Sequence, residues 1–202
     1  MISINDVRRT TNLHKIPKSI IVNKNIILDS KLASALEEPE NNIYWNYDFD
    51  VYLQKYEMNL QRPYVWEHFQ QQEFILSLLL EKPIESVIII EHEFAPSEDI
   101  LDKHNSVRYV IDGKQRLMTI QKFLHNEFTV NINGTEAYYK DFDSDLQRYF
   151  KSRVNSMTAT VYYSYWDCKV TDDMKIILFN YYNFAGTPQT EEHKNKLQSL
   201  IS

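Results

Sequence analysis

Residues 108–123 read RYVIDGKQRLMTIQKF, and this stretch decides the fold. The segment VRYVI at 107–111 predicts a buried strand. The segment after it predicts an amphipathic helix over 114–126, because apolar residues recur there with helical spacing, at Leu117, Ile120 and Leu124. Between strand and helix stands Gly113, one of only three glycines in the chain, although glycine usually makes up about 7% of a protein. This scarcity suggests that the position needs glycine.

The turn Asp112-Gly113 has the features of an anion site. The first turn of a helix carries N–H groups without intrahelical partners and a partial positive charge, which together favour phosphate. Gly113 lets a ligand approach the backbone without a Cβ clash, and Lys114 and Arg116 add positive charge. The alternative is a purely structural turn, in which Gly113 only turns the chain and Asp112 caps the helix. The spacing of a Walker A loop is absent.

A second cluster of polar and aromatic residues lies in NLQRPYVW at 59–66, just before another predicted helix. It contains Gln61, Arg62, Tyr64 and Trp66, and the proline after the arginine holds the backbone extended. These side chains are candidates for ligand binding. The alternative is that the two aromatic residues pack in the core and the arginine makes a surface ion pair.

A third cluster lies in LFNYYNFAGTPQT at 178–190. Asn183, Gly186 and Thr187 offer amide and hydroxyl groups to a ligand. The alternative is that Gly186 ends one helix and the residues after it cap the next. Taken alone, this segment favours the structural interpretation.

The rest of the chain predicts a mixture of strands and helices. Strands are predicted at 19–28, 43–58, 86–94 and 157–166, with a hairpin at 128–139 that turns at Asn133-Gly134. Helices are predicted within 29–42, where Pro39 ends the helix, and at 67–83, 141–153, 171–184 and from 190 onward. The order is not a regular βαβ alternation, so the predicted class is α+β. Residues 1–42 are predicted to form an N-terminal arm with a short helix, and residues 43–202 the main domain.

Composition and charge weigh against several classes of protein. The net charge is −6, and no Lys/Arg run exceeds two residues, so non-specific binding to duplex DNA is expected to be weak. A local basic groove for DNA stays open, because net charge does not describe its distribution. The single cysteine, Cys168, excludes an internal disulfide and a Cys-based zinc site and fits a cytoplasmic setting. No signal peptide and no membrane-spanning run is expected.

The segment EHEFAPSEDILDKH at 91–104 gathers acidic residues and two histidines. It raises the question of a metal site, because carboxylate and imidazole groups are metal ligands. We expect a solvated acidic loop instead, since clustered charges in a loop need no ligand and the HExxH spacing is absent.

The three clusters, in this order, resemble the DUF262 family, which is related to the ParB/sulfiredoxin superfamily. Its members include the N-terminal half of GmrSD-type restriction enzymes and SspE-type defence proteins. The family hallmark is QRxYxW, then a helix and an apolar strand, then DGQQR at the start of a helix, and later a segment like FxRxNxxGTxLT. The matching segments here are QRPYVW, VIDGKQRLMTIQKF and FNYYNFAGTPQT, and the resemblance covers about residues 50–200.

The resemblance implies a ParB-like α+β core, a mixed sheet flanked by helices, with a nucleotide pocket. In such relatives the DGQQR segment binds phosphate and supports hydrolysis of a nucleoside triphosphate, often GTP. The matching positions of that segment are Asp112, Gly113, Gln115 and Arg116. The first hallmark pair matches Gln61 and Arg62, and the third motif matches Asn183, Gly186 and Thr187.

The chain departs from the family pattern in three ways. Lys114 replaces the first glutamine of DGQQR and adds a positive charge, and Tyr181 stands where an arginine is expected. Larger relatives carry a C-terminal HNH nuclease domain, for which a chain that ends at Ser202 has no room. We therefore expect any DNA cleavage to come from a separate nuclease or other partner protein.

The expected function is a nucleotide-binding and hydrolysing module of DNA restriction or phage defence. Asp112, Gln115 and Arg116 are the expected catalytic residues, with Asp112 also a ligand of Mg²⁺. The expected nucleotide-binding residues are Gln61, Arg62, Tyr64, Gly113, Lys114, Asn183, Gly186 and Thr187. Two alternatives stay open: a non-catalytic DNA sensor or inhibitor that keeps the fold, and a ParB-like nuclease or small-molecule kinase.

Overall fold

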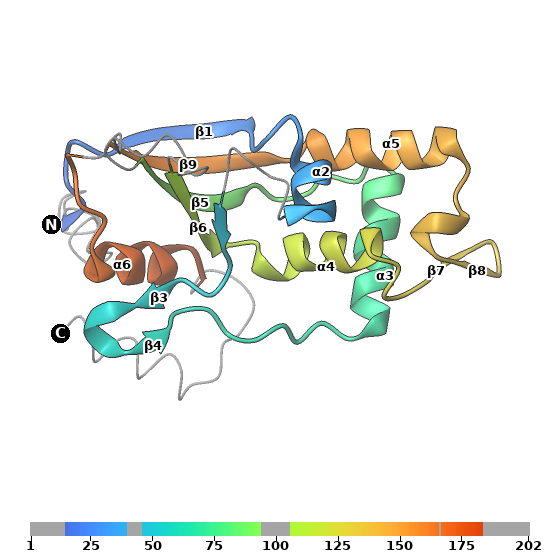
Figure 1. The fold of residues 1–202 in the computed structure, drawn as a ribbon, viewed down its shortest axis with the longest axis horizontal. Helices are drawn as coiled ribbons and strands as arrows, with labels where there is room; N and C mark the ends of the chain where they lie inside the picture. Colours follow the sequence, from blue (N-terminus) through green and yellow to red (C-terminus); the bar gives the residue numbers. More distant parts are fainter. Residues whose placement is uncertain (1–14, 40–45, 94–105, 166, 184–202) are drawn as a thin grey trace, which may run out of the picture.

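The computed structural model describes residues 15–39, 46–93, 106–165 and 167–183. The predicted arm up to residue 14, most of the acidic segment 91–104, Gly186, Thr187 and the predicted last helix lie outside the described residues. Within them the chain forms a five-stranded sheet with helices on both faces (Figure 1). The predicted α+β class, a mixed sheet flanked by helices, is confirmed.

The sheet has the strand order β1-β9-β5-β6-β2. The strands in this order are β1 (Ile21–Ile27), β9 (Thr158–Ser164), β5 (Val87–Glu93), β6 (Ser106–Asp112) and β2 (Asn46–Asp48). β5 pairs with β9 and β2 with β6 in parallel, whereas β1–β9 and β5–β6 are antiparallel. Because β5 and β6 are antiparallel, their C-terminal ends lie at opposite ends of the sheet. β6 leads directly into a helix.

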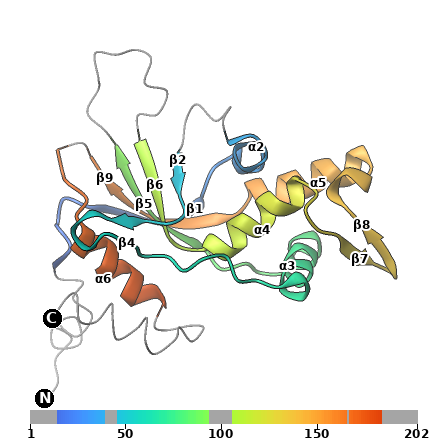
Figure 2. The ribbon, with the colours of Figure 1, turned by 60° about the horizontal axis from the view of Figure 1, so that its bottom comes forward.

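Two hydrophobic clusters fill the space on the two faces of the sheet. One joins the sheet to α2 (Leu32–Glu37), α3 (His68–Leu79), α4 (Lys114–Leu124) and α5 (Ser144–Asn155). The other joins it to α6 (Asp172–Asn183), which lies beside the hairpin of β3 (Tyr52–Leu53) and β4 (Met58–Asn59) (Figure 2). In β5, Val87 and Ile89 face the first cluster, and Ile88 and Ile90 face the second. Burial on both faces explains why this strand is a continuous apolar run.

Most elements lie where the sequence places them. The hairpin of β7 (Val130–Ile132) and β8 (Thr135–Ala137) turns at Asn133-Gly134, as predicted. The helix predicted at 171–184 is α6, and the hydroxyl of Thr171 accepts a hydrogen bond from the backbone N–H of Met174 at its start. No helix among the described residues is long and apolar enough to cross a membrane.

The single strand predicted at 43–58 is wrong. The described part of this segment contains β2, β3, a 3₁₀ turn at 54–56 and the first residue of β4. The carboxylate of Asp48 accepts the backbone N–H groups of Asp50 and Val51 and turns the chain, and Val51 adopts a left-handed φ of 53°. The alternation of bulky and polar residues that predicted one strand belongs to short pieces on either side of this turn.

Candidate functional site

A cavity of about 260 Å³ opens where β6 ends and α4 begins. It collects residues from four parts of the chain: the segment before α3, the segment before β5, the β6–α4 turn, and the end of α6. The lining residues are Gln61, Arg62, Trp66, Glu85, Asp112, Gly113, Lys114, Gln115, Arg116, Tyr182 and Asn183. The structure therefore brings residues from all three sequence clusters together at one site, with Asn183 as the predicted residue of the third cluster that it describes.

Gly113 is the N-cap of α4 and has a φ of 108°, a conformation that L side chains rarely adopt. A Cβ atom at this position would lie 2.9 Å from Cγ1 of Val87. The fold itself therefore requires glycine here, and the space expected for a ligand at the Cβ position is filled by Val87. The alternative that Asp112 caps the helix is also wrong, because Asp112 is the last residue of β6 and makes no cap hydrogen bond.

The first turn of α4 begins without a side-chain cap. The first backbone N–H to find an acceptor is that of Leu117, which donates to the carbonyl oxygen of Gly113 at 3.0 Å. The N–H groups of Lys114, Gln115 and Arg116 have no acceptor among the described residues. Unsatisfied donors at the positive end of a helix dipole thus lie at the cavity.

Arg116 is held by two protein partners and does not point into bulk water. Its Nη2 is 2.9 Å from Oδ2 of Asp112, and its Nη1 donates to the main-chain carbonyl oxygen of Glu85. The arginine side chain is 12% exposed and the carboxylate 36%. A ligand at the mouth of the cavity therefore meets a fixed guanidinium group whose positive charge is partly offset by the carboxylate of Asp112.

Lys114 extends its side chain toward the strained turn before β3. Its Nζ is 2.6 Å from Oδ1 of Asp50, and the lysine side chain is only 5% exposed, against 60% for the aspartate. The main-chain carbonyl of Asp50 also accepts the N–H of Gln61. The Asp50 residue thus links the two sequence motifs that contribute most of the cavity.

Gln115 ties the segment before α3 to the start of α4. Its Oε1 accepts the N–H of Val65 at 2.9 Å, and its Nε2 donates to the carbonyl of Pro63 at 3.2 Å. Both halves of the side-chain amide are therefore engaged within the protein. In this arrangement Gln115 positions the neighbouring segment, which carries Arg62.

Arg62 differs from the other cations of the cavity. It makes no hydrogen bond or ion pair with any residue that the structure describes, and its side chain is half-buried.

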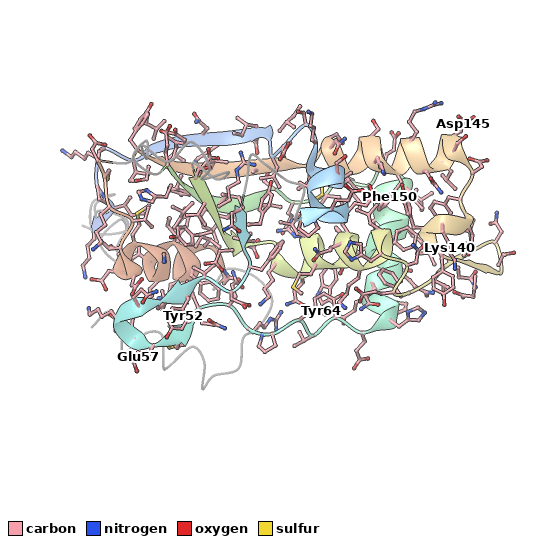
Figure 3. All side chains as sticks on the ribbon, viewed as in Figure 1. Tyr52, Glu57, Tyr64, Lys140, Asp145 and Phe150 are labelled. Atoms are coloured by element: carbon pink, nitrogen blue, oxygen red, sulfur yellow. The ribbon has the colours of Figure 1, made fainter. Side chains whose placement is uncertain are left out.

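Tyr64, two residues later, was predicted to bind the nucleotide but does not line the cavity. Its hydroxyl meets Oγ1 of Thr119 at 2.8 Å, and Nζ of Lys122 lies 5.4 Å from its ring centre, so it belongs with α4 (Figure 3).

Gln61 and Asn183 reach the cavity from opposite parts of the chain and share one anchor. Nε2 of Gln61 donates to the carbonyl oxygens of Val110 and Ile111, each at 2.7 Å. Nδ2 of Asn183 donates to the same carbonyl of Ile111 at 3.3 Å and to that of Phe179 at 3.1 Å. These contacts hold both amides beside the end of β6.

Two lining residues, Tyr182 and Glu85, were not predicted as site residues. Trp66 was named as a candidate in the second sequence cluster, and Tyr182 precedes the predicted Asn183, a proximity that was the signal available for it. Burial raises the pKa of Tyr182, whose hydroxyl contacts that of Tyr162 at 2.8 Å. Glu85 carried no signal, because its contact with Arg116 uses the main-chain carbonyl, which every residue type has.

Among the described residues no group of three or more His, Cys, Asp or Glu side chains forms a metal site. In the cavity, Asp112 is the predicted metal ligand, and Glu85 is the other carboxylate. Of the acidic segment 91–104, Glu91 makes an ion pair of 2.9 Å with Arg108 on the neighbouring strand. Burial raises the pKa of Glu91, and the arginine opposes this effect.

Comparison with known families identifies the chain's relatives. Residues 49–199 match the model of the GmrSD restriction endonuclease, N-terminal domain, and this range includes all three motifs of the cavity. Searches of curated proteins and of solved structures found no significant match. Since the family model covers most of its length, the chain belongs to the family of GmrSD restriction endonuclease N-terminal domains.

Proposed function

We propose that the cavity at the start of α4 binds a nucleoside triphosphate and hydrolyses it, in a module that serves DNA restriction or defence against phage. The observation that carries the proposal is the first turn of α4, whose N–H groups lie at a cavity that also contains Arg62. Neither these groups nor Arg62 has a partner in the part of the chain that the structure describes. Oriented N–H groups, a helix dipole and a guanidinium group are the standard partners of phosphate. The family name supports the link to restriction.

The size of the cavity suggests which part of the nucleotide enters it. A volume of about 260 Å³ is small beside the roughly 300–1,000 Å³ of pockets that enclose a drug-sized ligand. We therefore place the phosphates against the first turn of α4, with sugar and base toward the mouth. Arg62, which has no partner among the described residues, supplies one positive charge for the phosphates, and Arg116 supplies another from the first turn of α4.

The catalytic roles follow from charge development in phosphoryl transfer. Negative charge grows on the phosphate oxygens in the transition state, and fixed cations stabilise it. Arg116 is a fixed cation in the first turn of α4, and Lys114 joins it if phosphate replaces Asp50 as its partner. Gln115 orients the attacking water once it releases Pro63 and Val65.

Asp112 fits a role in binding Mg²⁺. Its carboxylate lies in the cavity, is partly exposed, and uses Oδ2 for Arg116, which leaves Oδ1 for another ligand. Mg²⁺ in proteins commonly takes one or two carboxylates together with substrate phosphates. When bound there, the ion would neutralise charge on the phosphate oxygens. GTP is the favoured nucleotide because of the family resemblance.

A separate nuclease or other protein is the proposed partner. The chain matches an N-terminal domain of a restriction endonuclease, and cutting DNA in such a system requires a nuclease centre. DNA contact through a local basic groove and a cytoplasmic location complete the proposal. The nucleotide then serves as the switch or energy source for that partner.

Isothermal titration calorimetry with GTP, ATP, CTP and UTP in the presence of Mg²⁺ tests the proposal. We expect one nucleotide to bind, and Arg62→Ala to weaken binding at least tenfold, since a hydrogen bond to a charged group contributes about 1.5–3 kcal/mol. Arg148→Ala is the matched control, because Arg148 is 80% exposed and pairs with Asp145 on the surface of α5. Absence of heat with all four nucleotides would refute nucleotide binding.

A second candidate function is favoured by the engagement of the cavity side chains. Lys114, Gln115 and Arg116 all hold protein partners, an arrangement that suits a binding protein without turnover. A phosphate-release assay on the nucleotide that binds separates the two. Steady release supports the hydrolase, and binding without release supports a sensor or inhibitor.

A further inference from the structure

We infer that Gln61 and Asn183 accept hydrogen bonds from the sugar hydroxyls of the nucleotide, so that the site selects a ribonucleotide. The inference rests on the proposed function and assigns the orientation and sugar class of the ligand. It depends on which atoms of these two amides the protein leaves for a ligand.

The orientation of both amides is dictated by their partners. Main-chain carbonyl oxygens only accept hydrogen bonds, so the groups that face them must be NH₂ groups. Gln61 meets two such carbonyls, those of Val110 and Ile111, each at 2.7 Å. Asn183 meets those of Ile111 and Phe179, at 3.3 and 3.1 Å. Flipping either amide would set oxygen against oxygen.

The side-chain oxygens of Gln61 and Asn183 are therefore the atoms that remain. Neither oxygen accepts a hydrogen bond from any described residue, and both residues line the cavity. Because the two NH₂ groups share the carbonyl of Ile111, the two oxygens belong to one part of the cavity wall. The two amides therefore offer the cavity acceptors only.

A part of the cavity lined by hydrogen-bond acceptors disfavours phosphate and favours a ligand group that donates a hydrogen bond. Phosphate oxygens at neutral pH are themselves acceptors, so they are repelled here and attracted by Arg62 and the start of α4. A hydroxyl group can donate, and a sugar brings two of them in a ribonucleotide. The cavity thus has two chemically opposite ends, one for phosphate and one for hydroxyl groups.

The short distance along the chain favours the sugar over the base as the donor. Ile111, which anchors both amides, is only two residues before Gly113, where the proposed phosphate site begins. The sugar is attached directly to the phosphate chain, whereas the base lies one unit further away. Hydrogen bonds from amino groups of the base would therefore place the phosphates beyond the first turn of α4.

Calorimetry with a series of guanosine ligands tests this inference: GTP, 2′-deoxy-GTP, 2′,3′-dideoxy-GTP and inorganic tripolyphosphate, all with Mg²⁺. We expect each removed hydroxyl to weaken binding about two- to tenfold, as one lost hydrogen bond does. In Asn183→Leu we expect the preference for GTP over the dideoxy nucleotide to shrink, while the affinity for tripolyphosphate stays as in the wild type. Thermal unfolding of the variant checks that it folds.

The possible outcomes separate the inference from the function on which it rests. Equal affinities along the sugar series, with tripolyphosphate still bound, overturn the inference and leave the phosphate site standing. An equal loss of tripolyphosphate and GTP affinity in a folded Asn183→Leu protein also overturns it, because the residue would then act on the phosphate. If none of the four ligands binds, the proposed function and the inference fail together.

Discussion

Replacement of Gly113 by alanine tests the packing at the β6–α4 turn. Two costs are expected. A left-handed backbone strained by a Cβ atom costs about 1–3 kcal/mol, and φ here is 108°. Overpacking against Val87, whose Cγ1 would lie 2.9 Å from the new atom, costs about 1–3 kcal/mol more. The free energy of unfolding should therefore fall by about 2–6 kcal/mol, a large part of the stability of a small protein.

Gly134 provides a control that separates the two costs. Its φ is 84°, but a Cβ atom there would meet no atom within 4 Å beyond Gly134 itself and its two neighbours in the chain. Gly134→Ala should therefore cost only the backbone strain, about 1–3 kcal/mol. Urea denaturation of both variants gives the free energies, provided the slopes agree.

A double mutant isolates the steric contact with Val87. On a Val87→Ala background, Gly113→Ala should cost about as much as Gly134→Ala, because the clashing methyl groups are gone. If Gly113→Ala in the wild-type background costs no more than Gly134→Ala, the close approach to Val87 does not explain the glycine.

Three further predictions concern charged groups. Arg116→Ala should weaken GTP binding about ten- to hundredfold by calorimetry, the worth of a charge-assisted hydrogen bond, and unchanged affinity contradicts its role. Asp50→Asn should lower the melting temperature but tighten tripolyphosphate binding severalfold, because Lys114 loses its carboxylate partner; weaker binding contradicts this. Burial lowers the pKa of Lys175, so its protonated form destabilises the fold at neutral pH. Relative to Lys175→Met, the wild type should gain stability as pH rises toward the ordinary lysine pKa, and parallel pH profiles refute this.

The turn from β6 into α4 could be predicted because two periodicities meet there. In the strand segment 107–111, Val110 and Ile111 face opposite sides of a covered sheet, and after the turn Leu117 and Ile120 repeat with the period of a helix. Both signals are local, so they are visible in a single sequence. The reason for Gly113 was not visible, because Val87 reaches it from another strand.

The chain around β2 shows why other parts escaped prediction. Val51 is β-branched and buried, yet it adopts a left-handed conformation that its type disfavours. The turn is held by Asp48 and by contacts that reach Leu60 and Lys114, which are distant in sequence. Tertiary contacts therefore override the local pattern that predicted a strand.

Residue types and short motifs in the sequence were enough to predict most of the residues that line the site, but not which partners hold them. Gln61, Arg62, the residues 112–116 and Asn183 were named in the sequence and line one cavity. Their internal partners were not foreseen, because Lys114 pairs with Asp50 across 64 positions of sequence. Such pairings depend on the fold, and no spacing in the sequence encodes them.

The central claim is that phosphate binds the free N–H groups at the start of α4. The most direct measurement is the change in backbone amide ¹H–¹⁵N chemical shifts when tripolyphosphate and Mg²⁺ are added to the ¹⁵N-labelled protein. The account predicts that the amides of residues 113–116 shift most and that those of the distant 133–134 turn stay in place. Unchanged amides at 113–116 under saturating tripolyphosphate would contradict it.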